Sequence, residues 1–513
     1  MELDRSRKRF SPVVWSILTH SSKEKVNHMA RVVVVSNRVM NMQQVTQAGG
    51  AAVAIADTLK NSNGLWFGWS GEIIADGPRE TVIEDDTGIS IATIPLTDEE
   101  HLGYYLGYAN SVLWPVFHNR LDLARFEAGY YNSYVDVNRR FAEKLKLLLR
   151  PDDIIWVHDY HLIDMARSLR RLGVSNRIGF FLHIPFPPSQ TFLAIPEHRD
   201  LAMALSAFDL VGLQTSADAS NLIDYLEHEA NGRLLPNFHI RVEDRELAVE
   251  IFPVGIEPGY FQNASAEIVG TIQSSAEIRI IGVDRLDYTK GLPQKFRAFG
   301  HFLETHPEYR RRIVLTQIAA PSRESVEAYA DIRQELQSLS GAINGELSEL
   351  DWVPIHYINR TIPRSSLASI YRGSRIGLVT PLRDGMNLVA KEYAASQDPE
   401  DPGVLILSKF AGAAEQLQEA LIINPYNREE VGKAILIAVE MPLEERKRRH
   451  RALLSKIEQQ DALHWSTRYL EALVRESVLP PEAKAPSEIL AATIKRLQTL
   501  RDFQIPPKST KVA

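Results

Sequence analysis

The chain has 513 residues, of which 44% are hydrophobic and 24% are charged. This length exceeds what one hydrophobic core usually supports, so it predicts a two-domain globular enzyme of ordinary composition. The formal net charge of -7 leaves no basic surplus for binding nucleic acid, so we expect no nucleic-acid partner, and any positive charge must be local. The absence of cysteine excludes disulfides, thiolate nucleophiles and cysteine metal sites. The cytoplasm is the simplest compartment for such a chain.

The first 28 residues predict a flexible N-terminal extension. Their apolar run, Val13 to Leu18, is too short for a membrane span of about 20 apolar residues or for the core of a signal peptide. Met29 stands directly before the first predicted strand. We therefore expect no membrane partner.

The first strand, loop and helix have the features of a diphosphate site. Residues 32–35 are four valines, typical of a strand buried on both faces, and a short polar segment that includes Arg38 follows. Gly49 and Gly50 precede a small-residue helix over 51–59, whose N-terminal N–H groups favour an anion. The alternative is a plain turn, because neither the dinucleotide fingerprint nor the P-loop spacing occurs.

Residues 64–126 are rich in aromatic side chains. Most of these rings suit a hydrophobic core. Tyr104, Tyr105, Trp114 and His118, however, lie among glycines and a proline without regular periodicity, which predicts a binding loop. Aromatic faces in such a loop suit a sugar ring.

A helix over 134–149 leads to three predicted strands that end in polar or histidine-bearing loops. The strands cover residues 154–157, 179–182 and 209–213. The carboxyl ends of parallel strands share one edge of a sheet, so the position of His183 favours a site. His158 and His161 could suggest a metal, but no third ligand follows at a recognisable spacing, and we predict no metal site.

A segment punctuated by proline and glycine, residues 251–259, predicts the hinge between the domains. The second strand series covers residues 278–283, 313–318, 354–358, 376–379 and 404–408. Its first strand ends in DRLDYTKG, where Arg285 and Lys290 could clamp phosphate oxygens; a surface ion-pair cluster is the alternative. The second strand leads to Arg323.

The loop TPLRDGMNLVAKE, residues 380–392, lies between a predicted strand and a helix start. It carries Arg383, Asp384, Lys391 and Glu392, which can bind hydroxyls and balance charge around a phosphorylated ligand. A solvated loop before an ordinary amphipathic helix is the alternative.

These elements predict an α/β fold with two domains that face one another across a cleft. Strand-end loops from both sides suggest a group transferase with a diphosphate donor and a second polar substrate. Helices are predicted over 428–441 and 444–476, with Trp465 suited to packing across both domains. The predicted boundaries are 1–28 for the extension, 29–255 for the acceptor domain, 256–457 for the nucleotide-sugar domain, 458–476 for a helix returning to the first domain, and 477–513 for a C-terminal extension.

From about Arg31 to Val474 the sequence resembles the bacterial type of trehalose-6-phosphate synthase, a group of retaining glucosyltransferases in glycosyltransferase family 20. The motifs that carry the resemblance are VVVVSNR, AGG, GLWFGWSG, VLWPVFH, HDYHL, GFFLHIPFP, PVGIEP, DRLDYTKG, QIAAPSR, TPLRDGMNLVAKEY and SKFAGAAEQL. They occur in order and extend over both predicted domains.

The resemblance implies a GT-B fold of two Rossmann-like domains and transfer of glucose from UDP-glucose to glucose 6-phosphate, with no cofactor. The catalytic residues it implies are Arg285, Lys290, His183 and Asp384. The donor-binding residues are Gly49, Gly50, Arg285, Lys290, Ile362, Leu388, Val389, Ala390, Lys391 and Glu392. The acceptor-binding residues are Arg38, Tyr105, Asp159 and Arg323, and Trp114 and Ile184 match positions linked to anomer selectivity.

Cleavage of a glycosyl phosphate develops negative charge on the departing diphosphate, at which Arg285, Lys290 and the helix after Gly50 are aimed. The sequence compels no closely spaced carboxylate pair of the kind that retaining glycosidases use. The family's usual account is front-face attack, with the phosphate of UDP taking the acceptor proton, and we adopt it as a hypothesis.

Two further expectations follow from the resemblance. Ile362 stands where relatives often carry an aromatic residue, so the preference among UDP, GDP and ADP stays open. Beyond the transferase region no phosphatase motif follows, so a separate phosphatase is expected downstream, and the enzyme is expected to be a homo-oligomer with a role in stress response and osmoprotection.

Two other functions stay open. A sibling transferase would use another phosphorylated acceptor such as glycerol 3-phosphate, although Tyr105 and Trp114 favour a ring. A catalytically silent sugar-phosphate sensor is the second alternative. The presence of the full set Arg38, His183, Arg285, Lys290, Asp384 and Glu392 argues against the sensor.

Overall fold

The computed structural model describes residues 30–39, 55–56, 58–60, 62–75, 80–86, 88–235, 239–267, 278–323 and 327–475. Gly49, Gly50 and the two predicted terminal extensions lie outside the described residues. The described part of the predicted helix over 51–59 is helical.

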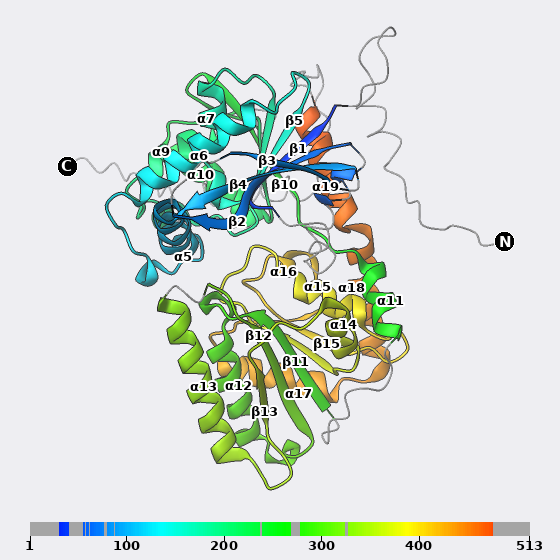
Figure 1. Ribbon diagram of the computed structural model, residues 1–513. Helices are drawn as coiled ribbons and strands as arrows, with labels where there is room; N and C mark the ends of the chain where they lie inside the picture. The colour runs from blue at the N-terminus through cyan, green and yellow to red at the C-terminus, as the bar shows by residue number, and fades with distance from the viewer. Residues whose placement is uncertain are drawn as a thin grey trace, which may run out of the picture.

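The N-terminal half is built on a mixed sheet in the order β3-β4-β2-β1-β5-β6-β7-β10-β9-β8 (Figure 1). The strands are β1 (Val32–Arg38), β2 (Leu65–Ile74), β3 (Val82–Asp86), β4 (Ile89–Thr97), β5 (Ile154–His158), β6 (Arg177–Phe181), β7 (Leu210–Leu213), β8 (Arg233–Leu234), β9 (His239–Val242) and β10 (Arg245–Ile251). The strands from β4 to β10 along this order are parallel, and β3, β9 and β8 add antiparallel edges. Strand β1 lies inside this sheet, and its four valines are fully buried, as the sequence predicts.

Helices cover this sheet. They are α4 (Asp98–Glu100), the π-helix η1 (His101–Leu113), α5 (Trp114–Phe117), η2 (Leu121–Leu123), α6 (Tyr130–Lys146), η3 (Tyr160–Leu162), α7 (Met165–Arg171), α8 (Ser189–Phe192), α9 (His198–Leu205) and α10 (Ser216–Glu229). Figure 1 shows α6, α7, α9 and α10 together on one side of the sheet.

The predicted irregular binding loop around Tyr104 and Trp114 is wrong, because these residues lie on η1 and α5. The glycines there serve close packing and not a turn. A Cβ on Gly103 would collide with the Ser133 side chain of α6. Small residues at this spacing therefore allow η1 to pack closely against α6. The prediction failed because it treated these glycines as a signal for a loop.

The C-terminal half is built on a parallel sheet in the order β13-β12-β11-β14-β15-β16. The strands are β11 (Ile278–Arg285), β12 (Ile313–Ala320), β13 (Ile355–Ile358), β14 (Ile376–Val379), β15 (Val404–Ser408) and β16 (Leu421–Ile423). The helical elements are η4 (Tyr288–Lys290), α12 (Leu292–Thr305), η5 (Pro307–Tyr309), α13 (Glu327–Leu347), α14 (Arg364–Arg372), α15 (Leu388–Ser396), α16 (Ala413–Gln416) and α17 (Arg428–Glu440). All five predicted strands of this half are confirmed.

Three helices join the two halves. They are α11 (Pro258–Glu267), α18 (Leu443–Gln459) and α19 (Ala462–Val474). The region predicted to be helical over 444–476 contains two helices, α18 and α19. The second begins after Asp461, which caps α19 by accepting from His464 N–H at 2.7 Å. Helix α18 packs against α15, and α19 returns to β6 and β7 of the first sheet (Figure 1).

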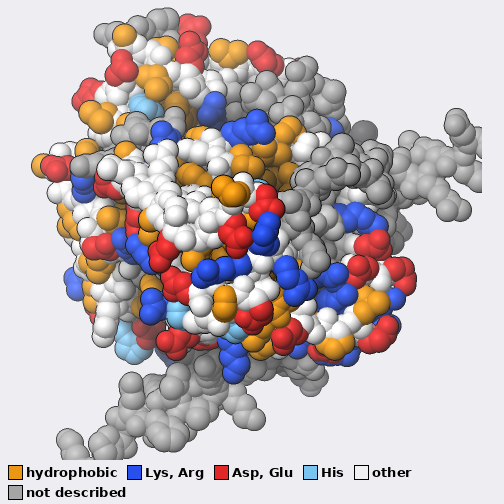
Figure 2. Space-filling view, turned by 90° about the horizontal axis from the view of Figure 1, so that it is seen from below, with side chains coloured by type: hydrophobic (Ala, Val, Ile, Leu, Met, Phe, Trp, Pro, Cys, Tyr) orange, Lys and Arg blue, Asp and Glu red, His pale blue; other side chains and the backbone are white. Residues whose placement is uncertain are grey.

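The two sheets therefore present their strand-end loops to each other. Side chains bridge the halves directly: Ser216 donates from N and Oγ to Glu415 at 3.1 and 2.9 Å, and Arg383 lies 3.4 Å from Asp218. Seen from below, basic and acidic side chains are interspersed over the surface (Figure 2). No helix in the described ranges is long and apolar enough to cross a membrane.

Candidate active site

The loop between β14 and α15 holds Asp384 by both backbone and side chain. Its N–H donates to Phe410 O at 3.1 Å, and Gly412 N–H donates to Asp384 O at 3.1 Å. Asn387, the N-cap of α15, donates from Nδ2 to Asp384 Oδ2 at 3.0 Å, and Lys290 Nζ lies 2.5 Å from the same oxygen. Burial raises the pKa of Asp384, but Lys290 and the hydrogen bonds outweigh burial and hold the pKa below its ordinary value. The carboxylate is therefore ionised at neutral pH.

The turn after β11 gathers positive charge around Asp287. Arg285 is exposed at the strand end, and Lys290 is buried at the end of η4. Burial raises the pKa of Asp287, but Arg323, Arg285 and Lys290 together lower it to about 2. Asp287 was not predicted as a site residue, although an acidic residue inside the basic motif DRLDYTKG was a signal for it.

Trp114 of α5 stacks on two arginines from the other half. The guanidinium carbon of Arg323 lies 3.8 Å from a Trp114 ring centre, and that of Arg285 lies 5.4 Å away. Arg323 also donates to the hydroxyls of Tyr160, at 2.9 Å, and Tyr329, at 2.6 Å. Burial lowers the pKa of Arg323, but the two tyrosines and a nearby carboxylate outweigh it and raise the pKa. A permanent cation is thus held at the domain junction.

The ends of β5 and β6 bring His158, Asp159 and His183 together. His183 Nε2 lies 3.1 Å from His158 Nδ1, and His183 N–H donates to Asp159 Oδ1 at 3.2 Å. Burial lowers the pKa of both histidines, and it raises that of Asp159 against the opposing attraction of His183. Neutral imidazoles of this kind are suited to hydrogen bonds with hydroxyl groups.

A series of ring contacts connects Tyr105 with Arg38. Tyr105 stacks on His161 at 5.8 Å between ring centres and contacts Trp69 at 5.4 Å, and the Arg38 guanidinium lies 5.9 Å from Trp69. His161 in turn contacts Tyr160 at 3.9 Å. Two predicted acceptor residues thus lie on one aromatic surface. Within the part of the chain that the structure describes, no three side chains are grouped as metal ligands.

Glu392 is buried inside α15 beside an unpredicted arginine. Tyr371 OH donates to Glu392 Oε2 at 3.4 Å. Burial raises the pKa of Glu392, and the positive charge of Arg364 opposes this rise. Arg364 lies over the rings of Tyr260 and Phe261, at 4.3 and 4.6 Å. Arg364 lies two residues after Ile362, and no sequence motif there indicated its role.

Apart from Lys391, which is buried on α15, the remaining predicted residues are apolar. Leu388, Val389 and Ile362 are half-buried and pack against one hydrophobic cluster, of which Ala390 is a buried member. Ile184 is buried next to His183. These side chains can make van der Waals contacts with a ligand but have no hydrogen-bonding groups.

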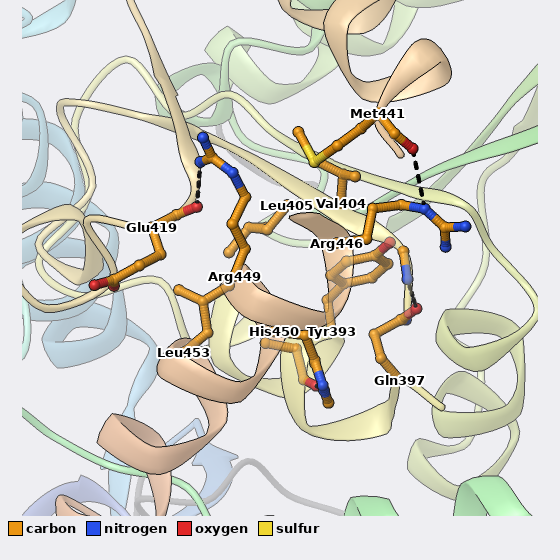
Figure 3. A pocket seen from close by; sticks show the side chains of 12 residues that line it. Tyr393, Gln397, Val404, Leu405, Glu419, Met441, Arg446, Arg449, His450 and Leu453 are labelled. Carbon is orange, nitrogen blue, oxygen red and sulfur yellow. Dashed lines mark hydrogen bonds between the residues drawn. The ribbon is translucent and has the colours of Figure 1, made fainter. Parts of the chain in front are cut away.

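A separate cavity lies between α15 and α18 (Figure 3). Its lining includes Gln397, Arg446, Arg449 and His450, and no predicted site residue. The polar members are engaged: Arg446 contacts Asp401 at 2.6 Å, and His450 Nε2 lies 3.1 Å from a backbone carbonyl of α15. This cavity is a feature of helix packing and lies apart from the candidate site.

The structure thus brings nine of the predicted residues into connected groups, whereas Glu392, Lys391 and the apolar residues lie outside these groups. Lys290 joins Asp384, Trp114 joins Arg285 and Arg323, His183 joins Asp159, and Tyr105 connects with Arg38 through Trp69. Chemically the arrangement offers cations for a diphosphate or phosphate, and ionised or neutral acceptors for hydroxyl groups.

A family model described as glycosyltransferase family 20 matches residues 17–475. The trehalose-6-phosphate synthase of Sodalis glossinidius (strain morsitans) is 44% identical over 477 residues, which cover 91% of this chain and 100% of that protein.

Solved structures agree in fold as well as in sequence. An alpha,alpha-trehalose-phosphate synthase (UDP-forming) from Burkholderia xenovorans, in complex with glucose-6-phosphate, superposes with a TM-score of 0.82 at 44% identity, covering 86% of this chain and 100% of that one. An E. coli structure described as bound with UDP-2-fluoro glucose has a TM-score of 0.83 at 43% identity, covering 87% and 99%.

Proposed function

This chain belongs to glycosyltransferase family 20, with a GT-B fold, and we propose that it transfers glucose from UDP-glucose to glucose 6-phosphate with retention, which gives α,α-trehalose 6-phosphate and UDP. The observation that carries the proposal is a cluster of charges at the domain junction: Lys290 pairs with Asp384, and Arg323 lies 3.6 Å from Asp287 and stacks on Trp114. The positive charge of Lys290 also helps to lower the pKa of Asp287. Relatives described with glucose-6-phosphate and with UDP-2-fluoro glucose support the two substrates.

On the donor side, Arg285 and Lys290 face the diphosphate. As the glycosyl bond breaks, negative charge grows on the leaving phosphate, and fixed cations stabilise it without reorganisation. The proposal also assigns donor binding through the backbone to Gly49 and Gly50, which lie outside the described residues. Glu392 accepts from the ribose hydroxyls. Leu388, Val389, Ala390 and Lys391 contribute backbone contacts, and Ile362 belongs to the loop that contacts the base.

On the acceptor side, Arg38, Arg323 and Tyr105 bind the phosphate of glucose 6-phosphate. Asp159 accepts from its sugar hydroxyls. His183 and Asp384 do the same for the transferred glucose. Trp114 and Ile184 select the anomer.

Retention proceeds by front-face attack, with a phosphate oxygen of UDP taking the acceptor proton. Asp384 is a poor nucleophile because Lys290 and Asn387 both occupy its Oδ2 and offset its charge. Mass spectrometry of enzyme denatured during reaction with a slow donor tests this step. A glucosyl adduct on Asp384 or Asp159 would replace the proposal by a double displacement.

The decisive experiment is product analysis after incubation with glucose 6-phosphate and, separately, UDP-, GDP- and ADP-glucose. We expect α,α-linked trehalose 6-phosphate, formed fastest from UDP-glucose. Product from glycerol 3-phosphate alone would identify a sibling transferase. Substrate binding without any turnover would identify a sensor.

Arg285→Ala tests the donor assignment. Loss of a charge-assisted contact to the leaving phosphate is expected to cost on the order of 2–4 kcal/mol in kcat/KM. Arg448→Ala, which removes an exposed arginine paired with Glu445, is the control and should match the wild type. A rise in KM at unchanged kcat would point to uniform donor binding instead.

The same proposal includes the cellular setting. The enzyme acts in the cytoplasm as a homo-oligomer, in stress response and osmoprotection, and a separate phosphatase consumes its product. Light scattering of the purified chain, phosphate release during long incubation, and growth of a deletion strain at high salt test these statements in turn.

A further inference from the structure

A series of three hydrogen bonds, two buried and one partly buried, connects the donor helix with the strand end that carries His183. Lys391 Nζ donates to Val254 O at 2.7 Å. Val254 N–H donates to Gln214 Oε1 at 3.0 Å, and Gln214 Nε2 donates to His183 O at 3.2 Å. Each member comes from a different part of the fold.

This series of hydrogen bonds passes through the junction between the two halves. Lys391 lies on α15, Gln214 follows β7, and Val254 belongs to the segment that connects β10 with α11. Val254 is thereby held at both of its backbone polar groups, one by each half of the molecule. The path is buried, since Lys391, Gln214 and Val254 are each 2% exposed.

The carbonyl that Gln214 holds also faces the donor loop. A Cβ on Gly385, the residue after Asp384, would collide with His183 O. The His183 backbone therefore touches the loop of one half while Gln214 anchors it to the other. The position of the His183 backbone therefore depends on the hydrogen bonds at the junction between the two halves.

We propose that Lys391 and Gln214 are positioning residues, which fix the His183 strand end relative to the donor helix through Val254. The inference rests on the proposed function in so far as His183 and Asp384 bind the transferred glucose. Neither side chain needs to touch substrate. A shift of about 1 Å in a positioned group is enough to cost on the order of 100-fold in rate.

The competing explanation is that these are ordinary buried bonds that serve stability alone. Gln397 provides a matched control, because its side chain bridges a backbone carbonyl and a backbone N–H in the same way. It donates to Tyr371 O at 2.7 Å and accepts from Gly403 N–H at 2.8 Å, and Figure 3 shows it beside the separate cavity. It is 4% exposed and is no part of the chain to His183.

The test compares Gln214→Met, Lys391→Met, the double variant and Gln397→Met in the full-length protein. We expect Gln214→Met to lower kcat/KM by about 10- to 100-fold while the Kd of UDP stays within about 2-fold. Gln397→Met should lose comparable thermal stability and keep the wild-type kcat/KM. The double variant should be about as slow as the slower single variant, because both break one path.

A second reading is the ratio of the Kd for UDP to the Kd for UDP-glucose, which measures how much the glucosyl group adds to binding. It should fall in Gln214→Met and not in Gln397→Met. If the wild type binds UDP-glucose but transfers nothing, the proposed function fails, and this ratio still decides the inference.

Three results would overturn the inference: wild-type kcat/KM in Gln214→Met, an equal loss in Gln397→Met, or losses that multiply in the double variant. Should Gln214→Met fail to fold, Gln214→Glu keeps an acceptor for Val254 N–H and replaces the amide donor to His183 O with a carboxyl oxygen, and Gln397→Glu is its matched control. Its kcat/KM then decides by the same criteria.

Discussion

At the scale of single residues, the pair between Lys290 and Asp384 controls the charge of the donor loop. Because the pKa of Asp384 is lowered, its ionised form stabilises the fold above the ordinary value of 3.8, and this contribution is lost as pH falls through the lower folded value. Function and stability thus depend on one ion pair.

Lys290→Met should leave Asp384 buried with only Asn387 as a partner. The pKa of Asp384 then rises, so the acid limb of kcat/KM moves to higher pH, kcat/KM falls by about 100- to 1000-fold, and unfolding becomes easier by about 3–5 kcal/mol. A pH–rate profile and urea denaturation measure these changes. Lys456→Met, which breaks the half-exposed pair with Glu419, is the control and should cost less than about 1 kcal/mol. An unmoved acid limb would contradict the role of Lys290.

Lys391 makes a second residue-scale prediction, on pH and stability. Burial lowers its pKa from 10.5 to about 7. Between these values the unfolded chain binds more protons than the folded one, so the free energy of unfolding should rise with pH there, by at most about 1.4 kcal/mol per pH unit. Lys391→Met should flatten this rise, whereas Lys456→Met should keep it. If the free energy of unfolding rose equally with pH in both variants, the lowered pKa of Lys391 would be refuted.

At the scale of elements, the start of α15 decides where Asp384 lies. Asn387 has φ of 73°, accepts from Ala390 N–H at 3.1 Å and donates to Asp384. It therefore combines a left-handed conformation, a helix cap and support for the carboxylate in one side chain.

Asn387→Ala should lose all three contributions and cost about 2 kcal/mol, from the cap and from the left-handed backbone. Asn387→Gly restores only the backbone freedom, so its Tm should lie between those of Asn387→Ala and the wild type. Both variants should lower kcat/KM, since both remove a hydrogen bond from Asp384. Equal Tm values for the two variants would show that the backbone conformation carries no strain.

At the scale of the whole molecule, α19 fastens the end of the C-terminal half to the N-terminal sheet. Its Trp465 is buried against Trp156 and Phe181, at 5.1 and 5.0 Å, and lies 6.1 Å from His183. One hydrophobic cluster includes residues of both halves around this helix. The relative placement of the two halves thus depends on apolar packing behind the site.

Trp465→Ala should cost about 3–5 kcal/mol of stability and should also lower kcat at a temperature where the variant is folded, because His183 loses its support. Trp352, buried in the C-terminal half with Nε1 donating to Ile313 O at 3.2 Å, provides the matched control. Trp352→Ala should be destabilised similarly with an unchanged kcat. Calorimetry and steady-state kinetics compare the two. Equal kcat values would separate α19 from the site.

Much of the site could be predicted because strand ends have a clear local signature. Arg285, Asp384 and His183 all follow short apolar runs, and parallel strands place such ends on one edge of a sheet. The aromatic stretch around Trp114 was wrongly predicted to be an irregular loop, because its glycines allow close packing against α6 and do not mark turns. Arg364 was missed because its partners, Glu392 and the rings of Tyr260 and Phe261, are distant in sequence. Asp287 was missed although the basic motif around it carried a signal.

The sequence by itself determined β1, β5, β6 and β7 of the first sheet, β11 to β15 of the second, the positions of their polar ends and the loop before α15. These features depend on hydrophobic runs and turn residues within short windows. Only the tertiary structure decided that Trp114 lies against two arginines of the other half, and that Lys391 is linked to His183 through Val254 and Gln214. The physical reason is that such contacts depend on how two separately patterned sheets pack, and no local pattern encodes the partner across a domain junction.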